Sequence, residues 1–145
     1  MYNSILVPVD LGHVNASRKA IDSAVQLAQL WQADLHVLAV LPDFGMPVVG
    51  SYFPEGYEKN ALREMKQKLA DFTNEHIVDG VSAKAHVAHG TIYEEILRAA
   101  KTLAVDLIVV SAHRPELKDY LLGPNAARVA RHAGCSVMVV RGEKN

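Results

Sequence analysis

Apolar residues follow two alternating patterns along this chain. Short runs of adjacent or alternating apolar residues predict five strands, at residues 5–9, 35–41, 83–88, 105–110 and 136–140. Between these runs apolar residues recur every three or four positions, which predicts helices, the last at residues 125–132. This alternation indicates an α/β fold, with one open five-stranded parallel sheet and helices on both faces. We expect a single domain over residues 1–145, because no repeat or linker interrupts the pattern.

Local signals indicate where some helices begin. Asn15 or Ser17 has the side-chain oxygen that caps a first helix. Gly90 followed by Thr91 predicts a turn and a cap before the third helix. Residues 42–55 hold three prolines, two glycines and three aromatic residues, and they are predicted to form a long loop. Its aromatic residues either cover a ligand or contact a second subunit, and both interpretations stay open.

Charge and cysteine content narrow the functional classes. The 145 residues include 15 basic and 16 acidic side chains, a net charge of −1, which argues against a nucleic-acid or membrane surface built on bulk charge. The single cysteine, Cys135, excludes an internal disulfide and suits a reducing compartment. The first residues do not resemble a signal peptide, and no apolar run approaches the roughly 20 residues that span a bilayer. We therefore expect a cytoplasmic protein.

Asp10 is the first candidate for a functional side chain. It directly follows the first predicted strand, so it lies at the carboxyl edge of the sheet, where open α/β sheets bind ligands. A carboxylate there binds a ribose hydroxyl, or holds a metal ion through water. The alternative is that Asp10 only turns the loop, and its position favours the functional interpretation.

The loop after the fourth predicted strand is the second candidate. Ser111, His113 and Arg114 follow that strand, and Gly123 precedes the last helix. The Arg114 guanidinium can make paired hydrogen bonds to phosphate oxygens, and Gly123 lets the backbone approach a ligand closely. A helix N-terminus at the same edge favours an anion such as a nucleotide phosphate. Taken singly, the arginine is also explained as a solvated loop charge and the glycine as a turn residue.

The remaining histidines and the missing motifs argue against catalysis. His86 and His89 are predicted on opposite faces of one strand, and His36 at the far end of another, so no zinc site is expected. The chain has no nucleophile elbow, no G-x4-G-K-S/T loop and no G-x-G-x-x-G after the first strand. We expect no catalytic residues, and at most very slow nucleotide hydrolysis or self-modification.

Five segments together resemble the universal stress protein family. They are VPVD near the start, VVSAHR, LLG, ARVARHAGCSV and the terminal VMVVR. The string SAHRPELKDYLLGPNAA is also similar to the proteobacterial F and G type subgroup. The resemblance covers essentially the whole chain. It implies a Rossmann-like fold of the adenine nucleotide alpha hydrolase type and ATP as the ligand, with any Mg²⁺ carried by the phosphates.

The resemblance also implies where the nucleoside binds. Asp10 matches the family aspartate that contacts the ribose, with Pro8 and Val9 beside it. Val40, at the end of the second strand, falls where the adenine is contacted, and Val110 is expected nearby.

The phosphate-binding motif of the family, G-x2-G-x9-G-S/T, is altered in this chain. Ser111 and Arg114 replace its first two glycines, and eight residues rather than nine separate Arg114 from Gly123. Gly123 is retained, whereas Pro124 replaces the serine or threonine and so lacks both a hydroxyl and an N–H. The N–H groups of the next two residues stay available, and Arg114 adds a positive charge. The four expected phosphate-site residues that complete the set are His113, Gly123, Asn125 and Ala126.

Two function classes follow. The first is a cytosolic stress-response regulator that binds ATP. The second is a non-ATP-binding dimeric interaction protein whose nucleotide site has decayed. In either case the strand containing Val137 and Val140 (residues 137–140) forms an exposed apolar edge in a monomer, which predicts a homodimer, with further assembly to a tetramer left open.

Overall fold

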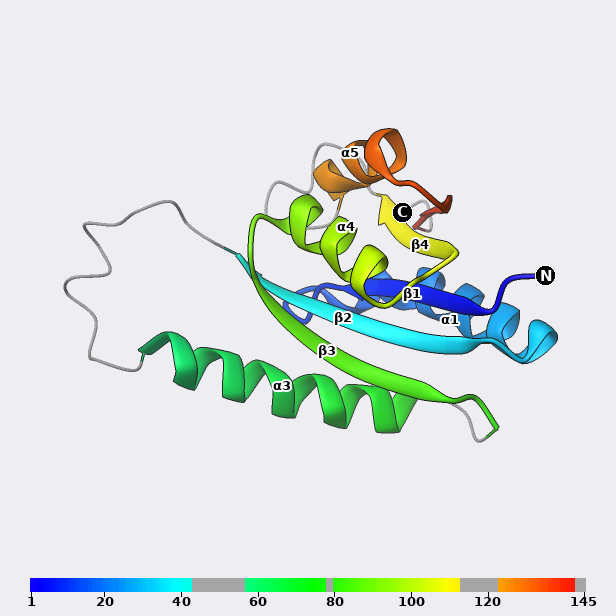
Figure 1. Cartoon of the computed structure of the whole chain (residues 1–145). Coiled ribbons are helices and arrows are strands. Elements are labelled where there is room, and N and C mark those ends of the chain that lie inside the picture. Colours follow the sequence, from blue (N-terminus) through cyan, green and yellow to red (C-terminus); the bar gives the residue numbers. More distant parts are fainter. Residues whose placement is uncertain (43–56, 78–79, 113–122, 143–145) are drawn as a thin grey trace.

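The computed structural model describes residues 1–42, 57–77, 80–112 and 123–142 and has the predicted alternation of strands and helices. Figure 1 shows one twisted sheet between two layers of helices. The elements are β1 (Ser4–Val9), α1 (Val14–Trp31), β2 (Asp34–Pro42), α3 (Tyr57–His76), β3 (Ala83–Gly90), α4 (Ile92–Thr102), β4 (Leu107–Ala112), α5 (Gly123–His132) and β5 (Ser136–Arg141). The α/β prediction is therefore confirmed.

The five strands form one parallel sheet in the order β3-β2-β1-β4-β5. The chain moves outward from β1 to β2 and β3, then returns to β4 on the other side of β1. Helices α1 and α3 cover one face, and α4 and α5 cover the other (Figure 1). The order reverses between β1 and β4, and the carboxyl edge at such a switch point is where ligands bind in open α/β sheets.

The central strand β1 is apolar and buried from Ile5 to Val9. Ile5, Leu6 and Val7 of β1 are each 0% exposed. Ile5 and Val7 face the core under α1 and α3, and Leu6 faces the core under α4 and α5. Successive side chains of a strand point to opposite faces, so a strand covered by helices on both sides has no polar position.

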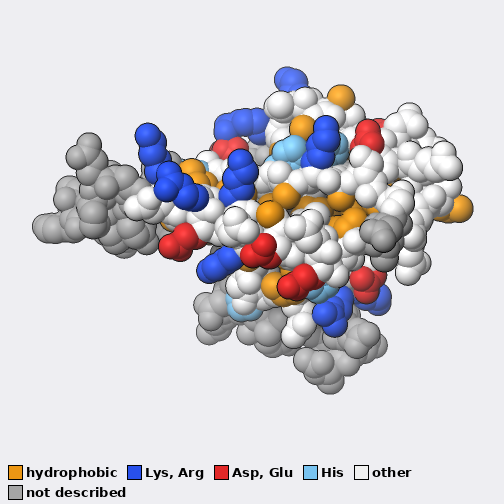
Figure 2. Space-filling view, turned by 90° about the horizontal axis from the view of Figure 1, so that it is seen from below, with side chains coloured by type: hydrophobic (Ala, Val, Ile, Leu, Met, Phe, Trp, Pro, Cys, Tyr) orange, Lys and Arg blue, Asp and Glu red, His pale blue; other side chains and the backbone are white. Residues whose placement is uncertain are grey.

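The two edges of the sheet differ. On β5, Met138 and Val139 are 37% and 41% exposed, which agrees with the expected apolar edge. On β3, the other edge strand, Lys84 is exposed. The face that carries α3 mixes Lys, Arg, Asp and Glu with patches of apolar side chains (Figure 2), in keeping with the balanced composition. None of the described helices is long and apolar enough to cross a membrane.

The start of α1 differs from the capping prediction. The helix begins at Val14 and its N-cap is His13, with no side-chain capping bond. Asn15 and Ser17 therefore lie inside the helix. Ser17 is fully buried, and its hydroxyl instead accepts the N–H of Asp10. Thr91 does occupy the N-cap of α4, but only its carbonyl takes part, accepting the N–H of Glu95 over 2.9 Å.

The fourth strand lies two residues later than predicted. The N–H of Val105 bonds to the Ala100 carbonyl over 2.9 Å, so this residue belongs to the turn between α4 and β4. The strand continues through Ser111 to Ala112, and Ser111 pairs with Val140 of β5. The prediction that Ser111 begins a loop is therefore wrong. Its small side chain fits the buried face of the sheet, where it is 1% exposed.

Candidate functional site

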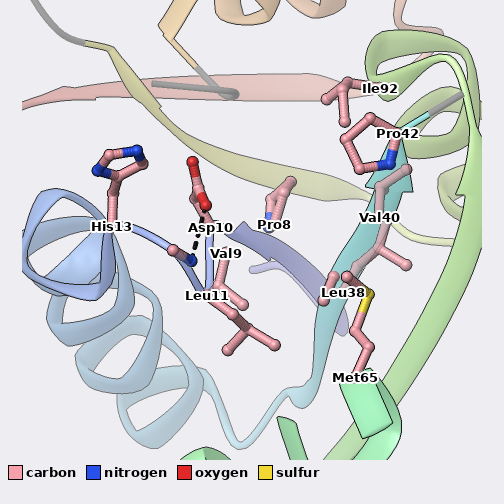
Figure 3. Close-up of a pocket in the computed structure, with 12 residues that line it drawn as sticks. Pro8, Val9, Asp10, Leu11, His13, Leu38, Val40, Pro42, Met65 and Ile92 are labelled. Atoms are coloured by element: carbon pink, nitrogen blue, oxygen red, sulfur yellow. Dashed lines mark hydrogen bonds between the residues drawn. The ribbon is translucent and has the colours of Figure 1, made fainter. Parts of the chain in front are cut away.

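A pocket of about 230 Å³ opens at the carboxyl edge of β1 and β2. Its walls come from the end of β1, the turn into α1, the end of β2, helix α3 and the first residue of α4 (Figure 3). The lining residues are Pro8, Val9, Asp10, Leu11, Gly12, His13, Leu38, Ala39, Val40, Pro42, Met65 and Ile92. This volume is somewhat below the roughly 300–1,000 Å³ of a whole small-molecule site, so the space suits part of a ligand.

Asp10 is the carboxylate of this pocket, and the surrounding backbone fixes its position. One carboxylate oxygen, Oδ1, accepts the N–H of Gly12 over 3.0 Å, while the second points away from that bond (Figure 3). The N–H of Asp10 donates to the Ser17 hydroxyl over 3.2 Å, and its carbonyl accepts the N–H of His13 over 3.0 Å. A Cβ at position 12 would lie 3.3 Å from Oδ1, so the glycine lets the turn pack tightly on the carboxylate.

Most of the pocket wall is apolar. Val40 and Pro42 contribute from the end of β2, and Ile92 contributes from the start of α4. Met65 contributes from α3. Branched and ring-shaped apolar side chains suit a flat aromatic ring, and a fixed carboxylate beside them suits hydroxyl donors. The chemistry of the lining therefore fits a nucleoside better than a bare phosphate.

Four of the predicted nucleoside residues meet in this pocket. Pro8, Val9, Asp10 and Val40 all line it. Val110 does not, but it is buried in β4 and packs in the same apolar cluster as Val40. The structure thus brings the carboxyl ends of β1 and β2 together and places Val110 behind them.

Ser111 places an unsatisfied polar atom in the strand beside β1. Its hydroxyl oxygen is buried and has no hydrogen-bond partner among the described residues. An unpaired buried hydroxyl is uncommon and costly. A ligand or a water molecule that bonds to Ser111 Oγ would remove that cost, so the atom fits a site that receives a polar group.

Helix α5 supplies the other predicted anion-binding element. It begins at Gly123, so Pro124 and Asn125 lie in its first turn. Ala126 is 3% exposed and packs into the core with Val40. Asn125 and Ala126, the predicted N–H donors to a phosphate, lie in this first turn. The predicted phosphate contacts His113 and Arg114 lie outside the described residues.

Several lining residues were not expected from the sequence. Leu11 and Gly12 belong to the turn after Asp10, and Met65 belongs to the second amphipathic segment. The sequence predicted Pro42 as the first residue of the long loop and Ile92 only as part of a helix, whereas in the structure Pro42 ends β2. Their meeting depends on the pairing of Pro42 with Gly90 across β2 and β3, which brings the start of α4 beside the end of β2.

Comparison with known proteins identifies the family. The model of the universal stress protein family matches residues 1–141. The chain belongs to this family. Universal stress protein G of Shigella flexneri is 32% identical over 143 residues, which cover 97% of this chain and 100% of that protein. The predicted family is confirmed, and universal stress protein G is of the predicted subgroup type.

Solved universal stress protein structures share the fold. The hypothetical protein MJ0577, solved as a test case of structural genomics, superposes with a TM-score of 0.80 at 26% identity and covers 100% of this chain and 99% of its own. A universal stress protein in complex with cAMP has a TM-score of 0.60 at 22% identity, covering 98% of both chains. The Rossmann-like fold class is therefore shown by these structures as well.

Proposed function

We propose that this universal stress protein binds ATP at the carboxyl edge of its sheet and acts as a cytoplasmic stress-response regulator. The observation that carries the proposal is the Asp10 carboxylate, held by the Gly12 N–H at one end of a largely apolar pocket. In this proposal adenine contacts Val9, Val40 and the region of Val110, and Asp10 accepts hydrogen bonds from the ribose hydroxyls.

The triphosphate is proposed to extend from the pocket toward β4 and the start of α5. Ser111 Oγ would donate to a phosphate oxygen, and His113 and Arg114 would contribute positive charge and further donors. The N–H groups of Asn125 and Ala126 would complete the set at the helix N-terminus. Mg²⁺ would arrive bound to the phosphates.

Because no nucleophile or general-base motif is present in the sequence, we propose a regulator rather than an enzyme. We also propose a homodimer formed through β5, where Met138 and Val139 are exposed. The solved family member that holds cAMP supports the choice of an adenine nucleotide, although that ligand belongs to the other protein.

One observation favours a second function. Pro124 lies in the first turn of α5, where it has no N–H to offer a phosphate. If this loss abolishes nucleotide binding, the exposed edge of β5 becomes the working surface, and the protein is a dimeric interaction protein.

Purification followed by denaturation separates these two functions. The proposal expects an adenine nucleotide, identified by mass, to be released from the native protein, and saturable binding when the stripped protein is titrated with ATP. Absence of both the released nucleotide and the titratable binding would leave only the interaction protein.

A further inference from the structure

Two histidines on neighbouring strands bind each other directly. His36 Nδ1 of β2 lies 2.9 Å from His86 Nε2 of β3, and the ring centroids are 5.0 Å apart. In the register His36 pairs with Lys84 and His86 pairs with Leu38, so the bond crosses the two strands diagonally. One ring must donate and the other must accept through a lone pair, so at least one imidazole is neutral.

The environment of the pair disfavours its charged forms. His36 is only 8% exposed and His86 is half-buried. Burial lowers the pKa of His36. The neighbouring His86 and Lys84 lower it further, whereas Asp34 raises it. Burial also lowers the pKa of His86, and Lys84 adds to this effect. Both rings are therefore harder to protonate in the folded protein than in an open chain.

The other elements packed around the pair supply little compensating charge. On this face of the sheet β1 presents Leu6 and Pro8, which are apolar. Helix α4 covers the same face, and its charged residues are Glu94, Glu95, Arg98 and Lys101. Of these, Glu95 and Arg98 bind each other through the carboxylate. Among the described residues no group of three or more metal-ligating side chains exists.

The histidine pair joins β2 to a strand at the edge of the sheet. β3 is an edge strand, so its backbone ladder is formed on one side only, to β2. With neither ring or one ring protonated, the hydrogen bond between the rings persists. With both rings protonated, each ring is a donor, no acceptor remains, and two positive charges face each other in a partly buried place.

We propose that His36 and His86 form an acid-labile latch that holds edge strand β3 on β2, and that acidification opens β3 locally while the central strands stay paired. This inference concerns a conformational device and does not depend on nucleotide binding. It follows from the geometry of the pair and from the position of β3 at the edge.

The direction of the pH effect follows from proton uptake. The pKa of each ring is lowered in the closed state, so the open state binds more protons. The latch is therefore at full strength above the open-chain value of about 6.5 and weakens as the pH falls below it. For each extra proton bound on opening, the opening equilibrium rises at most about tenfold per pH unit.

Native-state hydrogen exchange, corrected for the pH dependence of intrinsic exchange, tests this proposal on the full chain. Between pH 7.5 and 5.5 we expect opening of residues 83–90 to increase by about tenfold or more, while exchange in β1 stays unchanged. The double variant His36→Asn with His86→Gln puts uncharged amide groups near the two bonded nitrogens. It should lose the pH dependence, whereas His89→Gln, on the opposite face of β3, should retain it.

Equal pH dependence in β1 and β3, or an unchanged dependence in the double variant, would overturn the latch. NMR titration of the wild-type imidazoles gives a second test, needed if the double variant does not fold. The latch expects both rings to titrate below about 6.5, together with the β3 amides. Rings that titrate independently near that value contradict it.

Discussion

The Ser17 hydroxyl accepts the backbone N–H of Asp10 over 3.2 Å and thereby ties the first turns of α1 to the end of β1. Ser17 is 0% exposed and Asp10 is 4% exposed, so water cannot replace this bond. The site carboxylate therefore depends on a helix residue seven positions away for its backbone position.

Replacing Ser17 with alanine should destabilise the protein. The variant leaves the Asp10 N–H buried without this acceptor, which costs about 1–3 kcal/mol in the free energy of unfolding, as measured by urea denaturation. Ser23→Ala is the matched control, because that hydroxyl bonds to the Lys19 carbonyl at an exposed site of the same helix. The control should change stability by less than about 0.5 kcal/mol, and equal losses in both variants would contradict this account.

Asp10→Asn should weaken ATP binding without unfolding the pocket. Asparagine keeps an oxygen that can accept the Gly12 N–H but removes the negative charge that the proposed ribose contact uses. A hydrogen bond to a charged group contributes about 1.5–3 kcal/mol, so the dissociation constant measured by calorimetry should rise about tenfold to a hundredfold. Asp22→Asn, at an exposed position of α1, should leave the affinity unchanged. Wild-type affinity in Asp10→Asn would refute the ribose contact.

Gly90→Ala should destabilise the junction between β3 and α4. Gly90 has φ of 150°, and an added Cβ would come within 2.8 Å of Glu95 Oε1. Glu95 is 7% exposed and bound to Arg98, so it cannot move away freely. We expect a loss of about 1–3 kcal/mol in thermal or urea unfolding.

Two further variants separate the contact from the backbone conformation at this junction. In the Glu95→Ala background the contact with the added Cβ is absent. Gly90→Ala should therefore lower the free energy of unfolding less in that background than in the wild type. Gly134→Ala, where an added Cβ meets no atom within 4 Å, should be close to neutral. A neutral Gly90→Ala variant would show that the junction tolerates a side chain.

Val139→Lys should dissociate the proposed homodimer. Val139 is 41% exposed on the edge strand β5, and a charge there opposes pairing with a second edge. Sedimentation should give a dimer dissociation constant at least about tenfold higher than that of the wild type. Leu30→Lys, at a 70% exposed position of α1, introduces the same charge away from the edge and should not change assembly. A wild-type protein that is monomeric at micromolar concentration contradicts the dimer.

The strands were predictable because burial on both faces leaves a continuous apolar run, as in Ile5, Leu6 and Val7. The limits of β4 were not, since Val105 is apolar whether it lies in the turn after a helix or begins a strand. What decides is its hydrogen bond to Ala100, which no local pattern contains. The start of α1 was misplaced for a similar reason, because the buried Ser17 hydroxyl bonds to Asp10 and not to its own helix end.

In the candidate site, the sequence could place a residue only where that residue directly follows a predicted strand. Asp10 follows β1 directly, and its place at the carboxyl edge follows from the parallel order. Contacts between side chains on different strands could not be predicted in this way. His36 and His86 are 50 positions apart, and only the register of β2 with β3 makes them partners. Period-two reasoning placed His86 and His89 on opposite faces of one strand but carried no information about neighbours across strands.

The unlike edges of the sheet have a consequence for the size of any assembly. If both edges were apolar and equally able to pair, copies would add at either side and build an open fibre. Here Met138 and Val139 mark only the β5 edge, whereas Lys84 charges the β3 edge. Two copies that meet through β5 use up the same surface on each, so the contact closes on itself. In the proposed homodimer the sheet would double once, and the lysine on each outer β3 edge would oppose pairing of further strands there.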